Sequence, residues 1–181
     1  MKNNIKSNKK IYNLVLSAMF LGIGIVLPFF TGQIPSVGKM LLPMHIPVLL
    51  CGLVCGPEYG LIVGFVLPLV RSLWFGMPVL YPTAVGISFE MATYGFVAGF
   101  LYFKSKYKCI WALYKALIPA MITGRVVWGA VSAILIGISG SSFTFKAFLA
   151  GAFLNCIPGI VLQLILVPAV MIMLKRTKLV K

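Results

Sequence analysis

The chain has 181 residues, of which 61% are hydrophobic and only 10% are charged. An average soluble domain has roughly 45–50% apolar and 25% charged residues, so this composition excludes an ordinary soluble protein and indicates an integral membrane protein. One membrane-spanning helix needs roughly 20 apolar residues, which leaves room for about six spans and none for a second, soluble domain.

The net charge of +14 reflects membrane topology rather than nucleic-acid binding, because the cations collect at the ends of apolar segments. They precede the first span, separate the fourth from the fifth, and follow the last. The members are Lys2, Lys6, Lys9, Lys10, Lys104, Lys106, Lys108, Lys115, Lys175, Arg176, Lys178 and Lys181. Only Lys39 and Lys146 fall in loops on the opposite side, so the positive-inside rule predicts that both termini are cytoplasmic.

We therefore expect an all-α integral membrane protein, a compact bundle of about six transmembrane helices in a single domain, 1–181. The predicted helices cover residues 11–30, 44–55, 59–74, 83–103, 113–138 and 145–174. The second helix is too short to cross the membrane unaided and should be shielded by its neighbours. Segment 31–43, rich in Gly, Pro and Ser, is a long outer loop of the kind that often acts as a lid or gate.

The first predicted helix has a face of small residues. Ala18 and Gly22 are four residues apart, and Gly24 lies near them. Small residues let another helix backbone approach closely. Two interpretations remain open, namely packing within the bundle and docking of another membrane subunit.

Three charged residues lie within apolar sequence: Arg71, Glu90 and Arg125. Burying a charge in the bilayer costs at least about 2.5–3.5 kcal/mol, so these side chains should face the bundle interior. Arg71 and Glu90 come to similar depths when the third and fourth helices form a hairpin, and a salt bridge between them would staple it. Alternatively, Arg71 or Arg125 receives an anionic or hydrogen-bonding group of a ligand through its planar guanidinium. The two interpretations can coexist.

Other polar residues are candidates for the same interior site. His45 could bind a ligand from the outer side, although a lone histidine is more often a packing residue. Tyr94 follows Glu90 by one helical turn, and Asn155 and Gln163 belong to the sixth helix. We take Arg71, Glu90, His45, Arg125, Asn155 and Tyr94 as the candidate substrate-binding residues.

Enzymatic functions fit the sequence poorly. With two carboxylates and one histidine there is no two-histidine metal site, no paired-carboxylate motif and no nucleophile beside an obvious base. The four cysteines show no metal-ligand spacing, and no GxxxxGK[ST] phosphate-binding loop occurs. We expect neither metal nor cofactor, and any energy for transport must come from a partner or an ion gradient.

Two segments resemble a known family. They are HIPVLLCGLVCGPEYGLIVGFVLPLVRSLWFG, residues 45–76, and PTAVGISFEMATYGFVAGFLY, residues 82–102. They look like the substrate-binding S components of energy-coupling factor (ECF) transporters. Length, span number, the basic N-terminus and the small-residue face of the first helix also fit that family.

The resemblance implies a bacterial cell-membrane protein that binds a vitamin or related micronutrient in an outward-facing pocket gated by the loop after the first helix. It also implies that the first helix docks on a membrane coupling subunit that carries two cytoplasmic ATPases. Ala18 and Gly22 occupy the positions where the family often has two alanines. Binding residues in the family differ with the vitamin. The polar residues found here suit a small carboxylated or hydroxylated molecule, such as pantothenate, niacin, folate or a pyridoxine-like or pyrimidine vitamin, and riboflavin stays open.

Two other functions remain open from the sequence. An ion-coupled small-solute carrier could use Glu90 as its proton site, although no internal repeat is visible. A structural membrane subunit without a ligand would tolerate neutral residues at positions 71 and 90.

Overall fold

The structure, a computed structural model, describes residues 2–31, 43–106, 109–138 and 156–176. These residues form six α-helices and no strands, which confirms the all-α fold class. The helices are α1 (Lys2–Val26), α3 (His45–Cys55), α4 (Pro57–Phe75), α5 (Val85–Lys104), α6 (Ile110–Ile138) and α8 (Ile157–Arg176). A 3₁₀-helix covers Leu27–Thr31, and a short π-helical turn covers Leu80–Ala84.

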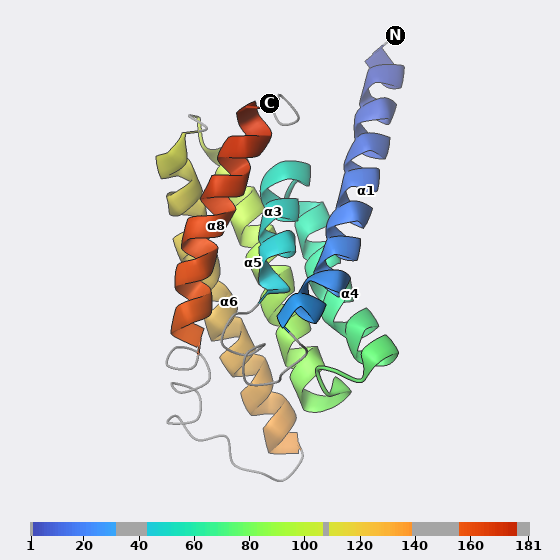
Figure 1. Cartoon of the computed structure of the whole chain (residues 1–181), viewed down its shortest axis with the longest axis vertical. Helices are drawn as coiled ribbons and strands as arrows, with labels where there is room; N and C mark the ends of the chain where they lie inside the picture. Colours follow the sequence, from blue (N-terminus) through green and yellow to red (C-terminus); the bar gives the residue numbers. More distant parts are fainter. Residues whose placement is uncertain (1, 32–42, 107–108, 139–155, 177–181) are drawn as a thin grey trace.

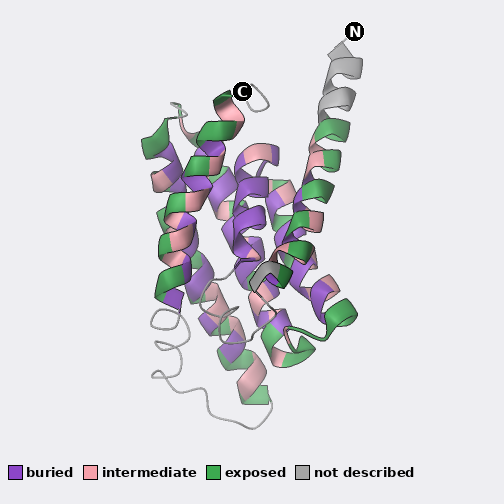
Figure 2. Cartoon of the chain, in the orientation of Figure 1, coloured by how far each residue is buried: buried purple, intermediate pink, exposed green. Residues whose placement is uncertain are grey.

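Five of these segments are long and apolar enough to cross a membrane, with lengths of 19 to 29 residues. They belong to α1, α4, α5 with its preceding turn, α6 and α8. Many large apolar residues on α1, α4, α6 and α8 are exposed, and Figure 2 shows exposed stretches along these helices, as expected for surfaces that face lipid. The chain is therefore a multi-pass membrane protein. Helix α1 begins and α8 ends at the same end of the bundle (Figure 1).

Helix α3 lies in the middle of the bundle (Figure 1), although it has only 11 residues. Ten of its residues are buried, from His45 to Cys55, and it packs against α1, α4, α5 and α8. Figure 2 shows this helix almost entirely in the colour of buried residues. A short helix can lie at membrane depth because other helices, and not lipid, surround it.

Helices α3, α4 and α5 touch backbone to backbone at glycines. A Cβ added to Gly60 of α4 would lie 2.7 Å from Cα of Gly52 on α3 and 2.7 Å from the carbonyl oxygen of Gly95 on α5. A Cβ on Gly99 would lie 2.6 Å from the carbonyl oxygen of Gly52. Real Cβ atoms do not come so close to backbone, so these three helices can pack this tightly only with glycine at the contacts.

Some helix ends differ from the sequence expectation. Helix α1 begins at Lys2 rather than near residue 11. The prediction placed the helix start where the apolar sequence begins, whereas the helix extends further back through the polar, lysine-rich start of the chain. It ends at Val26, and the chain continues as a 3₁₀-helix that contains Pro28, which has no N–H to donate. Helix α8 begins at Ile157. Residues 145–155 and most of the predicted outer loop, 32–42, lie outside the described residues.

Candidate functional site

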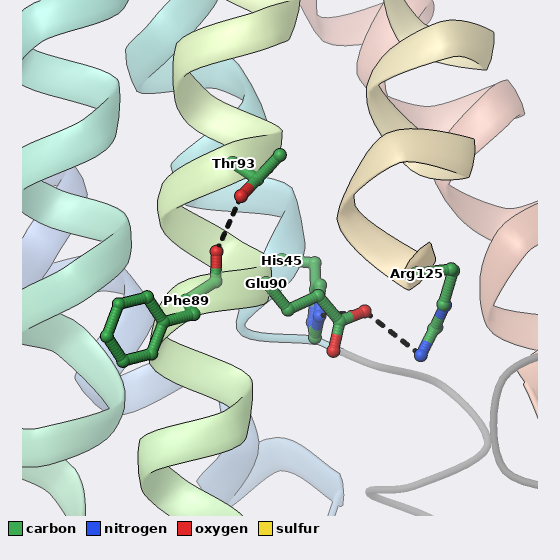
Figure 3. A network of polar contacts seen from close by, with 5 residues as sticks. All are labelled: His45, Phe89, Glu90, Thr93 and Arg125. Atoms are coloured by element: carbon green, nitrogen blue, oxygen red, sulfur yellow. Dashed lines mark hydrogen bonds and ion pairs between the residues drawn. The ribbon is translucent and has the colours of Figure 1, made fainter. Parts of the chain in front are cut away.

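An ion pair between Glu90 and Arg125 lies at the centre of the candidate site. Glu90 is in the second turn of α5 and Arg125 is near the middle of α6. The Arg125 Nη1 and Glu90 Oε1 atoms are 3.0 Å apart, and both side chains are almost fully buried (Figure 3). Each charge compensates the other in an environment where an isolated charge would be strongly disfavoured.

His45 approaches the same carboxylate from α3. Its Nε2 atom is 3.6 Å from Glu90 Oε1, and its side chain is also buried. His45 is the first residue of α3, so the N-terminus of that helix lies beside the ion pair. Figure 3 shows the three side chains converging from three different helices.

Tyr94 completes one wall of this cluster. It lies one helical turn after Glu90, interacts with the Glu90 side chain, and its ring centroid is 5.3 Å from that of His45 in an edge-on arrangement. Its ring occupies the space that a side chain at position 124 would need, since a Cβ on Gly124 would collide with Tyr94 Cε1 and Cδ1. Gly124 thus lets the tyrosine ring pack against α6 directly beside Arg125.

Several buried polar atoms of this region have no hydrogen-bond partner among the described residues. They are His45 Nδ1 and Nε2, Glu90 Oε1, and Arg125 Nε and Nη2. Gln163 Nε2, on α8, is a further buried donor without a partner among the described residues. A buried donor without a partner costs about 1–3 kcal/mol, so a protein rarely keeps several of them near one another without water or a ligand to satisfy them. The site can therefore receive a molecule that offers hydrogen-bond acceptors.

Comparison with known protein families supplies the context for this site. Residues 12–171 match the family described as ECF transporter, substrate-specific component. The chain belongs to this family. No curated protein matches it. As an S component it is a substrate-binding transport subunit rather than an enzyme, with a small molecule as substrate and an ECF module as partner.

Arg71 of this S component lies apart from the cluster. Its Nη1 atom donates a 2.7 Å hydrogen bond to the carbonyl oxygen of Ile25 near the end of α1. Its guanidinium carbon lies 5.4 Å from the ring centroid of Phe29 and 5.6 Å from that of Phe75. The Arg71–Glu90 salt bridge was one of the two interpretations that the sequence left open for Arg71, and the structure does not form it. Glu90 instead turns toward α3 and α6, while Arg71 holds the end of α1 through the Ile25 carbonyl.

The small-residue face of α1 is divided between the inside and the outside of the S component. Ala18 is exposed, and a Cβ added to Gly22 would meet no atom within 4 Å in the described part of the chain. Gly24 instead faces the bundle, where a Cβ would lie 2.5 Å from Leu67 Cδ2. Internal packing therefore explains Gly24 but neither Ala18 nor Gly22.

Sequence reasoning found four residues that the structure brings together, namely His45, Glu90, Tyr94 and Arg125. Asn155 lies outside the described residues. Two neighbours were missed. The buried Cys156 interacts with the Arg125 side chain, and Gly124 makes room for Tyr94. The only signal for Gly124 was its position directly before an intramembrane arginine, and nothing in the sequence pattern pointed to Cys156.

Proposed function

We propose that this S component captures a vitamin or related micronutrient from outside the cell and delivers it inward together with a membrane coupling subunit and two cytoplasmic ATPases. The observation that carries the proposal is the buried cluster around Glu90 and Arg125, whose polar atoms exceed the partners that the described residues offer. A purely structural ion pair would need no additional donors, whereas a binding site must leave some unoccupied for its ligand.

The proposed binding residues are His45, Glu90, Tyr94 and Arg125, with Asn155 as a further candidate from the sequence. Arg71 is left out of this set because its guanidinium already donates a hydrogen bond to the Ile25 carbonyl and contacts the rings of Phe29 and Phe75. The ion pair also argues against an ion-coupled carrier that uses Glu90 as its proton site, since Glu90 is paired with a cation and is not an isolated proton acceptor.

The proposed orientation follows the distribution of lysine and arginine, with both termini in the cytoplasm of a bacterial cell. His45 opens α3, and α5 begins one to two turns before Glu90, so the cluster lies toward the end of these helices that is farther from the chain termini (Figure 1). This orientation puts the site nearer the outer surface and makes residues 31–43 the proposed outer gate.

The proposed docking surface for the coupling subunit is the outward face of α1 that contains Ala18 and Gly22. No atom of the described residues lies within 4 Å of a Cβ built on Gly22, and small residues permit close helix approach. Gly22→Leu should abolish uptake driven by the ATPase module and leave ligand affinity unchanged, because the leucine side chain would point away from the bundle. Normal uptake by the variant in cells that carry the complete transporter would contradict the docking role. Gly22→Ala, which keeps the face small, is the matched control.

Native mass spectrometry of protein purified gently from cells grown in rich medium tests the binding function directly. A discrete added mass that matches a vitamin is the expected result. An empty spectrum that stays empty after incubation with a panel of vitamins would overturn the proposal, and the ion-coupled carrier or the ligand-free subunit would take its place.

A further inference from the structure

The Arg125 guanidinium forms an ion pair through one of its nitrogen atoms and has an edge of two others without a partner. Nη1 contacts Glu90, whereas Nε and Nη2 have no hydrogen-bond partner among the described residues. Nε and Nη2 form the side edge of the planar group, where two N–H bonds point the same way. This is the edge that binds a carboxylate through two parallel hydrogen bonds. Arg125 is 4% exposed, so bulk water does not satisfy this edge.

The unpartnered atoms around this edge are mainly donors. Arg125 contributes only donors, and a neutral His45 ring carries one donor and one acceptor. The acceptor is Glu90 Oε1, which makes no hydrogen bond but lies 3.0 Å from Arg125 Nη1 and 3.6 Å from His45 Nε2, so its charge is compensated by the ion pair. A ligand that fits this arrangement must therefore supply acceptor atoms, preferably two in one plane.

The electrostatic environment also favours a negative group. Helix α3 begins at His45, and the side chain of its N-cap residue, Met44, makes no capping hydrogen bond to the first amides. The N-terminus of a helix carries a partial positive charge and attracts anions. Because His45 reaches the ion pair, this end of α3 lies beside Arg125 and Glu90 and offsets part of the negative charge of Glu90.

We propose that the substrate carries a carboxylate and that this group binds the Nε–Nη2 edge of Arg125, while Glu90 holds the other side of the guanidinium in place. This inference rests on the proposed function and narrows it to one chemical class. A cationic substrate would face the arginine and the positive end of α3. An uncharged substrate with a single carbonyl group would leave one of the two parallel N–H groups unsatisfied.

Matched pairs of acids and uncharged analogues test the inference on the unaltered protein. Isothermal titration in detergent would compare pantothenate with panthenol and nicotinate with nicotinamide, and would add folate, riboflavin and pyridoxine. We expect the tightest ligand to be one of the acids. Where that acid has a paired uncharged analogue, the analogue should bind about 100-fold more weakly, the loss typical of a buried hydrogen-bonded charge whose partner is removed.

Arg125→Lys provides the second test, since lysine keeps the positive charge but lacks the two-pronged edge. Affinity for the acid should fall about 100-fold, a loss within the range found when a hydrogen-bonded charge pair is broken. Thr123→Val is the matched control on the same helix, because the Thr123 hydroxyl donates to the Pro119 carbonyl and its side chain is exposed. If R125K does not fold, the comparison of ligands on the unaltered protein decides alone.

The outcomes separate the inference from the proposed function. Tight binding of riboflavin or pyridoxine, or equal affinity for an acid and its uncharged analogue, would overturn the carboxylate proposal and leave vitamin binding intact. Unchanged acid affinity in R125K would likewise overturn the assignment to Arg125. If no panel member binds and no molecule copurifies with the protein, the proposed function itself fails, and this inference fails with it.

Discussion

Glu90→Gln should destabilise the protein because it leaves the buried Arg125 charge without its counter-charge. At the observed separation of 3.0 Å, the attraction between the two charges is about 5.5 kcal/mol for an effective dielectric constant of about 20. Removing one partner of a buried pair typically costs about 3–5 kcal/mol. We expect the free energy of unfolding to fall by about 3 kcal/mol, the lower figure because His45 and the glutamine amide remain near the guanidinium.

A double-mutant cycle in mixed detergent micelles measures the coupling directly. Unfolding free energies would be determined for Glu90→Gln, Arg125→Gln and the double variant, with tryptophan fluorescence as the signal. The coupling between positions 90 and 125 should be about 2 kcal/mol or more, as expected for groups in direct contact. A second cycle with Arg71→Gln is the matched control, because Arg71 has the same charge but bonds to the carbonyl of Ile25.

The reasoning would be refuted if the coupling between positions 90 and 71 equalled or exceeded that between positions 90 and 125. That result would restore the hairpin staple that the sequence left open and would remove the ion pair from the candidate site. Coupling near zero in both cycles would also refute it, since a buried pair at 3.0 Å cannot be energetically silent when either partner is removed alone.

Three further predictions concern packing, the second arginine and topology. Gly60→Ala should lower the melting temperature in detergent strongly, since the new Cβ would lie 2.7 Å from backbone atoms of two neighbouring helices, and overpacking costs about 1–3 kcal/mol. Gly22→Ala should not lower it, because no atom of the described residues lies within 4 Å of the new Cβ. Arg71→Gln should lower stability by about 1–3 kcal/mol through loss of a charged hydrogen-bond donor and leave ligand affinity unchanged, and a large loss of affinity at equal stability would contradict this. The exposed Cys109 thiol has a pKa below its ordinary value, chiefly because of a backbone hydrogen bond from Ala112. Its thiolate therefore persists at lower pH than that of an ordinary cysteine, so a membrane-impermeant maleimide should label it at neutral pH in inside-out vesicles but not in intact cells, and labelling in intact cells would reverse the proposed topology.

The sequence was sufficient for the fold class because membrane solvation leaves few alternatives. Apolar runs of about 20 residues must be helical, since lipid cannot satisfy the backbone. The short second helix could also be recognised, because a segment between His45 and Cys55 cannot span the bilayer alone. The start of α1 could not be placed in the same way. A lysine-rich segment can continue a helix into water, and hydropathy does not record that continuation.

The candidate site was predicted only in part. The charge of a residue and its depth in the membrane do not determine which neighbouring helix its side chain faces. Two arginines were available to Glu90, and the sequence favoured the one on the adjacent helix of the hairpin. Which of them Glu90 meets depends on the rotation of α5, and that rotation is set by close packing rather than by charge.

The glycines of α5 explain the choice of Arg125. A helix turns by about 100° per residue, so Gly95, which meets Gly60 of α4, lies about 140° around the helix from Glu90. Gly86 and Tyr94, each four residues from Glu90, lie on nearly the same face as the glutamate. A Cβ on Gly86 would lie 3.2 Å from Ser132 Oγ of α6, and Tyr94 packs at Gly124 of the same helix. Close contact of the Gly95 face with α4 therefore turns the Glu90 face away from α4 and toward α6, where Arg125 is the cation that it meets.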